Sequence, residues 1–502
     1  MIVDERTTRR GAIVPPPGER RRGPTMTLLW HPDPVRIGDV APIAARTQVS
    51  RVEPEFGPPG ARPVGPLGDR HVSRRPVVVL AASGDGVTVA RGEAAEQIRL
   101  DGAVLTGSTV LDAAALDRGA VLELEGRIAI LVHRRVAPRP AAPDHGLIGA
   151  SDAIEDLREA IAACAASAAP TLVCGETGTG KELVARAIHR ASARRDGPFV
   201  AVNLAALPAA VAVAQLFGHR KGAFTGAVDA SAGYFRAADG GTLFLDEVGA
   251  AALDVQAMLL RALEQHEIQP IGEPAVRVDV RMIAATDADL AAAVRAGGFR
   301  EALLYRLAGL SIATPALRDR PDDVARLLLA FLREELAALG AADRLRARSG
   351  DEALWLPAGF VAAACRQRWP GNVRELRNLG RRLAVAHHGV DAVALETLGG
   401  MLEVAAPPPE REAVDDARIV EALEANGWQI GRTAAELKIS RTTLYAVMER
   451  SGRAVKARDL DREDIAAAGE HTGGDVVQMA AELRVSVRAL KLRIRELGLP
   501  FR

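Results

Sequence analysis

Residues 175–182 read Gly-Glu-Thr-Gly-Thr-Gly-Lys-Glu and decide the fold of the central part of the chain. They follow the apolar run 171–174, Thr-Leu-Val-Cys, which is typical of a buried strand. After the loop, apolar residues recur at helical spacing from Lys181 to Ile188. Glycines let the backbone turn tightly and aim its N–H groups at phosphate oxygens, and a helix N-terminus adds a partial positive charge. The stretch therefore predicts a phosphate-binding loop, with Lys181 reaching the β- and γ-phosphates of a nucleotide.

All eight residues of this loop are candidate ATP contacts: Gly175, Glu176, Thr177, Gly178, Thr179, Gly180, Lys181 and Glu182. A Ser or Thr usually follows the lysine of such a loop and holds Mg²⁺, whereas Glu182 stands there in this chain. The competing interpretation is a glycine-rich turn between a strand and a helix that binds no nucleotide.

A second apolar run, residues 243–245, ends in the acidic pair Asp246 and Glu247. An acid at the carboxyl end of a parallel strand lies at the crevice where such sheets bind ligands. Asp246 is placed to hold Mg²⁺, and Glu247 is placed to polarise the attacking water. The alternative is a pair of acids that cap a solvated helix after a core strand. Together with the upstream lysine, the pair predicts an α/β ATPase that takes ATP and Mg²⁺.

Between the two halves of this site lie residues 222–227, Gly-Ala-Phe-Thr-Gly-Ala. The three segments, in this order and at this spacing, resemble the sigma-54-activating branch of the AAA+ ATPases, also called bacterial enhancer-binding proteins. Members commonly carry Gly-Lys-Glu at the phosphate loop, as this chain does. The resemblance implies that one loop contacts the sigma factor, and that it consists of Gly222, Ala223, Phe224, Thr225, Gly226 and Ala227.

The resemblance covers residues 146–390, with an ATPase core at 146–315 and a helical lid at 316–390. It implies that Asn203 restrains the catalytic glutamate, and that Thr286 and Asp287 form the sensor I segment. It also implies further roles for three arginines. Arg300 and Arg306 match the arginine fingers supplied to a neighbouring subunit, and Arg374, in the Trp-Pro-Gly-Asn-Val-Arg-Glu-Leu stretch 369–376, matches sensor II and faces the nucleotide.

Three positions depart from the family pattern, and one of them is Gln215, which stands where an acid is common. Arg220 stands where members have an acid, so Arg220 and Lys221 place two cations on the stem of the loop. Asp287 stands where members have an asparagine, which adds negative charge near the γ-phosphate if its side chain points inward. The departures at Arg220 and Asp287 motivate an alternative, a DNA-binding regulator with an impaired ATPase that acts by occupancy.

Composition predicts three or four domains for the 502 residues, because domains are typically 100–200 residues long. Lys plus Arg and Asp plus Glu both number 64, so any nucleic-acid face must be local. The three cysteines predict neither a disulfide framework nor a zinc site, which fits a cytoplasmic protein. No apolar run is long enough to span a membrane, and residues 1–26, rich in arginine and proline, are expected to be a disordered tail.

Residues 27–136 alternate short apolar runs with Gly, Pro and Asp turns, which predicts an all-β domain. Residues 36–38, Arg-Ile-Gly, and Ser73 with Arg74 are similar to a forkhead-associated (FHA) β-sandwich, which binds phosphothreonine peptides. Asp39 and Pro76 stand where that family has an arginine and a histidine. The resemblance implies a phosphopeptide or regulatory protein as partner, and a sandwich that does not bind phosphothreonine is the alternative.

Proline-containing linkers are expected at residues 137–145 and 391–415, and helices after them. Residues 416–452 have a short helix, a turn and a second helix, a layout that places the second helix in the major groove. They resemble the Fis-type helix-turn-helix of these activators, and the implied DNA contacts are Arg441, Thr442, Thr443 and Tyr445. A helical hairpin that serves dimerisation is the alternative.

Residues 457–502 repeat this layout and form a predicted second helix-turn-helix, with Arg488 and Lys491 as DNA contacts. From 481 to 502 there are six cations and two acids, a local excess that suits a phosphate backbone. A solvated helical face is the competing interpretation.

The resemblance therefore implies an activator of transcription that binds double-stranded DNA upstream of a promoter. It would assemble as a homo-oligomer, by analogy a hexamer, and hydrolyse ATP between subunits to remodel the sigma-54 RNA polymerase holoenzyme. A general AAA+ remodeller is the remaining alternative.

Overall fold

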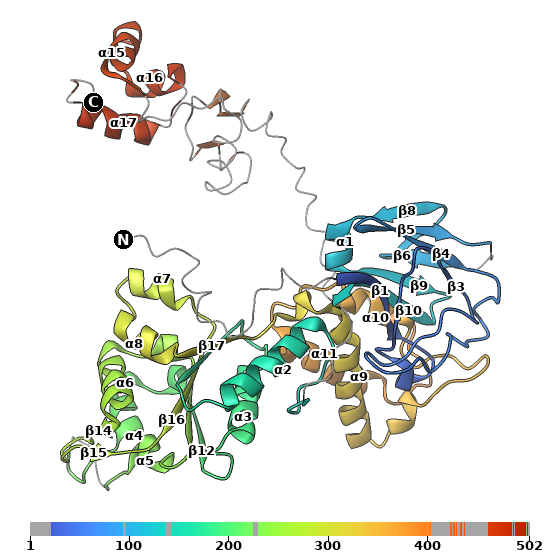
Figure 1. Ribbon diagram of the computed structural model, residues 1–502, viewed down its shortest axis with the longest axis horizontal. Helices are drawn as coiled ribbons and strands as arrows, with labels where there is room; N and C mark the ends of the chain where they lie inside the picture. Colours follow the sequence, from blue (N-terminus) through green and yellow to red (C-terminus); the bar gives the residue numbers. More distant parts are fainter. Residues whose placement is uncertain are drawn as a thin grey trace. The chain divides into compact units, whose positions relative to one another are not determined.

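The computed structural model describes residues 22–93, 97–136, 143–223, 229–398 and 400–402, scattered residues between 422 and 436, and most residues from 460 to 499. The chain divides into two compact units, residues 1–404 and residues 405–502 (Figure 1). The first unit contains a β-sandwich, an α/β core and a helical lid. The second contains the described C-terminal helices.

The β-sandwich consists of two antiparallel sheets, as the alternating apolar runs predict. The six-stranded sheet has the order β2 (Val40–Pro42), β1 (Arg22–Trp30), β10 (Ile128–Val136), β9 (Ala120–Leu124), β6 (Ile98–Leu100) and β7 (Ala103–Val104). The other has the order β3 (Thr47–Val49), β4 (Val78–Ser83), β5 (Gly86–Arg91) and β8 (Ser108–Leu111), with α1 (Ala113–Arg118) beside it. Because β1 pairs with β10 from Arg22 onward, residues 22–26 are strand and not part of a disordered tail.

The central strands of the six-stranded sheet are buried on both faces, because successive side chains of a strand point to opposite faces. In β10, Ile128, Ile130 and Val132 enter the core between the two sheets. The alternate residues Ala129 and Leu131 join a second core, formed with the lid helices. The strand therefore reads as a continuous apolar run, the pattern expected when both faces of a sheet are covered.

The ATPase core is a parallel sheet in the order β12 (Phe199–Asn203), β13 (Thr242–Asp246), β16 (Arg281–Thr286), β11 (Thr171–Cys174) and β17 (Leu310–Ala313). Helices α2 (Asp152–Ala165) and α3 (Lys181–Ala191) share a hydrophobic core with one face. The other face packs against α4 (Ala209–Phe217), α5 (Gly233–Ala237), α6 (Leu253–Gln265), α7 (Leu290–Arg295) and α8 (Glu301–Leu307). The predicted strands at 171–174 and 243–245 and the helix from Lys181 are confirmed.

The segment between α4 and α5 is tied to a neighbouring hairpin, β14 (Glu267–Ile268) and β15 (Val276–Arg277). His219 forms bridges with Ser231 and with Ile271, and Arg236 pairs with Glu273 at 2.9 Å. Residues 224–228, which contain most of the expected sigma-factor loop, lie outside the described residues.

The lid contains α9 (Pro321–Ala338), α10 (Ala358–Cys365) and α11 (Asn372–His387). Val393, Leu398 and Leu402 are buried in its core, so the lid continues beyond residue 390, where a linker was expected. Burial of these apolar side chains stabilises the packing of residues 393–402 against the lid helices.

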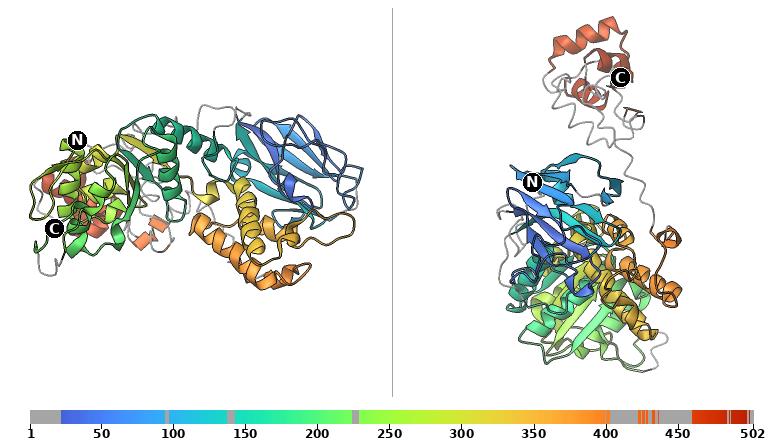
Figure 2. Two further views of the ribbon diagram at one scale, coloured as in Figure 1. Left: turned by 90° about the horizontal axis from the view of Figure 1, so that it is seen from below. Right: turned by 90° about the vertical axis from the view of Figure 1, so that its right-hand side faces the viewer.

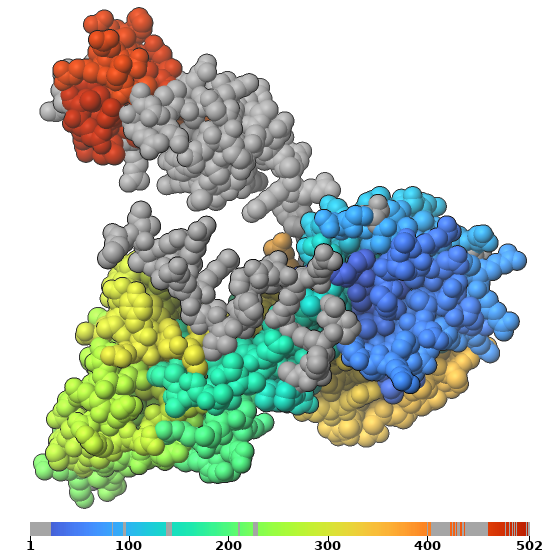
Figure 3. Space-filling view, in the orientation of Figure 1, coloured from blue at the N-terminus to red at the C-terminus, as the bar shows by residue number. Residues whose placement is uncertain are grey.

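The sandwich and the lid share one hydrophobic core. They lie side by side in the ribbon views of Figure 2, and their blue and orange surfaces adjoin in Figure 3. Trp30 of β1 is 4% exposed, and its indole N–H donates to the Leu356 carbonyl at 2.9 Å. The backbone N–H of Ala358 donates to Gly126 at 3.1 Å. Glu123 of β9, buried on the lid side, lies 3.6 Å from Arg366, and its burial raises the pKa of the carboxyl group.

The C-terminal unit contains α15 (Arg462–His471), α16 (Val476–Glu482) and α17 (Val487–Glu496) around an apolar core. A short turn joins α16 to α17, which is the layout predicted for residues 457–502. Most of residues 416–452 lie outside the described residues. Among the described helices, none is both long and apolar enough to cross a membrane.

Replacing Trp30 with alanine should lower the free energy of unfolding of the first unit by about 3–5 kcal/mol, because the change leaves a cavity in the core that joins sandwich and lid. Urea titration followed by circular dichroism measures it. Val35→Ala is the matched control, since Val35 is 79% exposed on the same domain. Equal stability of the two variants would show that the shared core contributes nothing to the fold.

Candidate active site

The phosphate-binding loop joins β11 to α3 and needs glycine for close packing. At Gly175 (φ +153°), a Cβ would lie 1.9 Å from the hydroxyl of Thr314, the residue that directly follows β17. At Gly178 (φ +79°), it would lie 2.2 Å from the Gly371 carbonyl of the lid. Both side-chain-free positions let the loop fit between the sheet and the lid.

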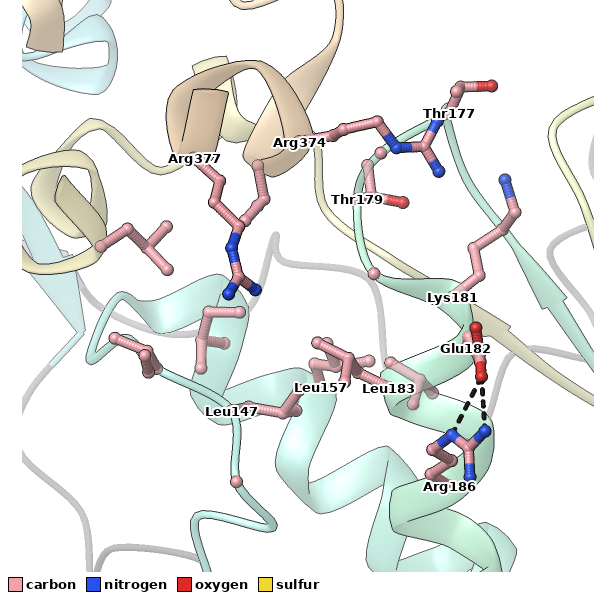
Figure 4. Close-up of a pocket in the computed structure, with 18 of the residues that line it drawn as sticks. Leu147, Leu157, Thr177, Thr179, Lys181, Glu182, Leu183, Arg186, Arg374 and Arg377 are labelled. Carbon is pink, nitrogen blue, oxygen red and sulfur yellow. Dashed lines mark hydrogen bonds and ion pairs between the residues drawn. The ribbon is translucent and has the colours of Figure 1, made fainter. Parts of the chain in front are cut away.

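Lys181 is the first residue of α3 and is 7% exposed. Its ammonium group donates to the Gly175 carbonyl at 3.0 Å and lies 3.6 Å from the Glu247 carboxylate. The next side chain, Glu182, accepts hydrogen bonds from Arg186 one turn along the helix, at 2.7 and 3.0 Å (Figure 4). The lysine is thus held between the loop carbonyl of Gly175 and the carboxylate of Glu247.

The ends of neighbouring parallel strands bring Asn203, Asp246 and Glu247 together. The Asn203 amide donates to Asp246 Oδ2 at 3.3 Å, so this hydrogen bond goes to the aspartate and not to the glutamate that the resemblance implied. Glu247 adopts a left-handed backbone conformation, φ +53°. Its burial raises the pKa of its carboxyl group, partly opposed by Lys181.

Asp287 points toward the phosphate-binding loop. Its carboxylate accepts a hydrogen bond from the Thr177 hydroxyl at 2.6 Å, and this bond lowers the pKa of Asp287. The Thr286 side chain, one residue earlier, is buried and accepts from the Ala288 N–H. The family departure at 287 therefore adds an acid beside the loop and close to Glu247.

A cavity of about 540 Å³ lies between the loop, α2, α3 and the lid. Its polar end contains the loop, Asp246, Glu247 and Asn203, and its other end contains apolar side chains from α2, α3 and α9. Arg374 of α11 lines the polar end, and Figure 4 shows it directed toward Thr177 and Thr179. A concave site with an apolar end and a few convergent polar groups suits a nucleotide.

Three side chains tie the loop to the lid, and only one of them, Glu176, was a predicted site residue. The Glu176 carboxylate accepts two hydrogen bonds from Arg318, at 2.6 and 2.7 Å, and one from Asn372 at 3.1 Å. These bonds lower the pKa of Glu176 to about 2. Arg318 lies at the start of the lid and Asn372 is the first residue of its helix α11, and nothing in their spacing indicates a contact with the loop.

Arg300 and Arg306 lie at the two ends of α8 and do not line the cavity of their own chain. Arg300 Nε donates to the Leu253 carbonyl at 3.2 Å. Arg306 lies 3.2 Å from Glu264, with its side chain 59% exposed. Their place on the surface of the core leaves them available to a second subunit.

The remaining predicted residues fall on other parts of the chain. Gly222 and Ala223 follow the exposed Arg220 and Lys221, and the rest of that loop is outside the described residues. Arg441, Thr442, Thr443 and Tyr445 are also outside them. Arg488 and Lys491 lie on α17, where Lys491 is exposed.

In the sandwich, Asp39 is 5% exposed and its carboxylate accepts from Arg36 at 2.6 Å. The Ser73 hydroxyl accepts from the Arg75 backbone N–H at 3.0 Å. The position where the FHA pattern has an arginine is thus occupied by a buried acid that is paired with Arg36.

Comparison with known proteins places three family models on the chain. The sigma-54 interaction domain matches residues 147–313, the AAA+ ATPase lid domain matches 318–413, and the Fis family of bacterial regulatory proteins matches 410–450. The first two meet near the start of α9, where the core gives way to the lid.

Whole proteins show the same likeness. The anaerobic nitric oxide reductase transcription regulator NorR of Aeromonas salmonicida is 39% identical over 76% of this chain and 72% of its own length. The transcriptional regulator NtrC of Azospirillum brasilense is 38% identical over 70% and 69%. The activator HyfR of Escherichia coli is 40% identical over 62%, but the chain spans only 48% of it. A solved structure of NtrX from Brucella abortus in complex with ATP is 32% identical, covers 61% of this chain and 69% of its own, and has a TM-score of 0.45.

Replacing Glu176 with glutamine should raise the KM for ATP roughly two- to fivefold, the range that an exposed ion pair of up to about 1 kcal/mol allows. The folded-state pKa of about 2 lies below the ordinary 4.5, so the tie is complete above pH 4.5 and is lost as pH falls through 2. Steady-state ATPase assays should therefore give the same ratio at pH 6 and pH 8. Glu352→Gln, which breaks the exposed pair with Arg346 in the lid, is the control. An unchanged KM would mean that the tie does not act on the nucleotide.

Proposed function

This chain belongs to the sigma-54-dependent transcriptional activators, DNA-binding ATPases that drive sigma-54 transcription, and we propose that hydrolysis at Lys181 moves the loop of residues 222–227 against the polymerase. The observation that carries this proposal is the position of the loop in the fold. It is inserted between β12 and β13, the two strands that end in Asn203 and Asp246. A change at the carboxyl ends of these strands is therefore connected to the loop through the chain itself.

ATP fits the cavity through the residues already described. The buried Lys181 supplies a cation for the β- and γ-phosphates. Glu247, whose pKa is raised by burial, is suited to take a proton from the attacking water. Asp246 offers carboxylate oxygens, the ligand type that Mg²⁺ prefers, at the crevice end of its strand. When bound, Mg²⁺ would neutralise charge on the phosphate oxygens.

We propose that the active form is a homo-oligomer, by analogy a hexamer. Arg300 and Arg306 lie outside their own cavity, so they could complete the site of a neighbour, as an arginine finger does. Assembly would then control hydrolysis, because an isolated chain lacks the two additional cations that a neighbour would supply to stabilise transition-state charge. Arg374, from the chain's own lid, would contact the phosphates from the opposite side.

The stem of the loop is built to move as a unit with the β14–β15 hairpin. The bridge of His219 with Ser231 closes the stem, and its bridge with Ile271, together with the Arg236–Glu273 pair, holds the stem to the hairpin. The Arg220 backbone N–H also donates to the Ile271 carbonyl at 3.0 Å, and the side chains of Arg220 and Lys221 are exposed. We propose that Phe224 and Thr225, at the end of this stem, contact the sigma-54 holoenzyme.

The C-terminal helices would hold the oligomer on double-stranded DNA upstream of the promoter. Residues 416–452 would read sequence through Arg441, Thr442, Thr443 and Tyr445. Arg488 and Lys491 of α17 would contact phosphates, because they lie in the segment 481–502, where cations outnumber acids. We propose that the protein acts in the cytoplasm, where it would meet the polymerase on DNA.

Two variants test the proposed coupling in a purified system. Lys181→Ala should abolish ATP turnover and open-complex formation together, because the phosphates lose their cation. Thr225→Ala should leave turnover within about twofold, since it contributes no phosphate ligand, and still abolish open-complex formation. ATPase assays and promoter opening by sigma-54 polymerase measure the two properties. Opening by Thr225→Ala would show that the loop is wrongly assigned, and DNA binding by a wild-type protein without turnover would favour regulation by occupancy.

We propose that the sandwich is the regulatory input and takes a regulatory protein as partner, with phosphothreonine recognition weakened by Asp39. Helix α9 connects it to the nucleotide cavity. Arg326 donates to the Gly38 carbonyl of the sandwich at 2.6 Å, and a Cβ at Gly38 would lie 2.0 Å from that guanidinium. The next residue, Leu327, lines the cavity, as does Phe331 one turn later. A shift of the sandwich would therefore reach the nucleotide through one helix, and by linkage ATP would affect the sandwich equally.

Hydrogen exchange measures this coupling. ATP should slow exchange in α9 and also in β1 and β10 of the wild-type protein. Arg326→Ala should keep the protection of α9 but reduce that of the two strands, because the contact with Gly38 is lost. Arg333→Ala, an exposed change on the same helix, should behave as wild type. Full protection of the strands in Arg326→Ala would exclude this route.

A further inference from the structure

The inner face of α11 carries two arginines, Arg374 and Arg377, which are three residues apart and therefore lie on the same side of the helix. Both line the cavity. In Figure 4 their guanidinium groups diverge: Arg374 is directed toward Thr177 and Thr179, and Arg377 toward the opposite end, where Leu147 and Leu157 lie. Arg374 has a role in the proposed function, whereas Arg377 has none.

Two contacts from α9 hold the Arg377 guanidinium. Its Nη2 lies 2.7 Å from the Glu334 carboxylate, and its central carbon lies 5.6 Å from the centre of the Phe331 ring. The side chains of Arg377 and Glu334 are 53% and 61% exposed, and an ion pair so exposed contributes little to stability. The ion pair is therefore better explained by its effect on the orientation of the Arg377 guanidinium than by a contribution to stability.

The end of the cavity near Arg377 suits an apolar, planar group. Leu147, Leu157, Leu183 and Phe331 line it, and Leu183 is 55% exposed, which is high for an apolar side chain in a hollow. The phosphates of a nucleotide would occupy the loop end, beside Lys181. A nucleotide carries its base at the end away from the phosphates, so the base falls at this apolar end.

We propose that Arg377 binds the base of ATP by stacking its guanidinium plane on the adenine ring, with Phe331 and Glu334 keeping the plane in position. Arginine planes stack on nucleobases in this way, and lysine, a point charge, does not. The inference rests on the proposed function, since it takes the occupant of the cavity to be ATP. The two arginines of α11 then have different roles. Arg374 acts on the phosphates, and Arg377 determines the affinity for the nucleoside.

Inorganic tripolyphosphate separates these two roles, because it has phosphates and no base. Calorimetric titration of the full-length protein with ATP and with tripolyphosphate, each with Mg²⁺, gives two dissociation constants per variant. Arg377→Ala should weaken ATP binding roughly tenfold, the effect of losing one base stack, and leave tripolyphosphate binding unchanged. In ATPase assays the loss should appear in KM, with kcat retained.

Two further variants sharpen the test. Arg381→Ala removes an exposed arginine one turn along the same helix, outside the cavity lining, and should match the wild type in every measurement. Arg377→Lys keeps the charge without the plane and should resemble Arg377→Ala. Restoration of ATP affinity by lysine would overturn the stacking role.

The outcomes also separate this inference from the proposed function. Wild-type protein that binds neither ATP nor tripolyphosphate would contradict both. Wild-type protein that binds both, with Arg377→Ala indistinguishable from Arg381→Ala, would contradict the inference alone. Equal weakening of ATP and tripolyphosphate by Arg377→Ala would assign the residue to the phosphates instead of the base.

Discussion

One buried side chain, Asn372, joins the phosphate-binding loop to two parts of the lid, the segment of Leu317 and the start of α11. Its amide oxygen accepts from the Leu317 N–H, and its NH₂ group donates to the Thr177 carbonyl and to the Glu176 carboxylate. Since Asn372 also begins α11, the position of the lid helix is set by the loop that would hold phosphate. Arg374 reaches the polar end of the cavity only because this residue places the start of its helix there.

The parts of the site that follow from local sequence were predictable. A strand, a glycine-rich turn and a helix occur in order around Lys181, and the acidic pair at 246–247 directly follows a strand. Parallel strands then bring these ends to one edge, because their carboxyl ends share that edge. No knowledge of distant contacts is needed to place Lys181 beside Glu247.

The lid contacts were not predictable in the same way. Arg318 and Glu176 are separated by 142 residues, and an arginine followed by an aspartate looks like any solvated turn. The hydrogen bond from Asn203 to Asp246 also differs from the implied one, because the amide is positioned by strand register as well as by residue type. The shared core of sandwich and lid was not predictable either, because it too depends on a contact between residues far apart in the sequence. The alternation in β10 shows that two faces are apolar, but it does not show what covers the second face.

That second apolar face has a consequence for how such a protein can diversify. Modular exchange of an N-terminal domain requires a polar boundary, and here Ala129, Leu131 and Val121 complete the core of the lid. A fragment beginning at residue 146 would present the opposing lid surface, including Phe360 and Val361 of α10, to water. Contiguous apolar surface of that kind promotes association. Replacement of the sandwich by a domain without a matching apolar face would thus leave an ATPase that tends to associate. The sandwich and the lid are therefore constrained to be inherited together.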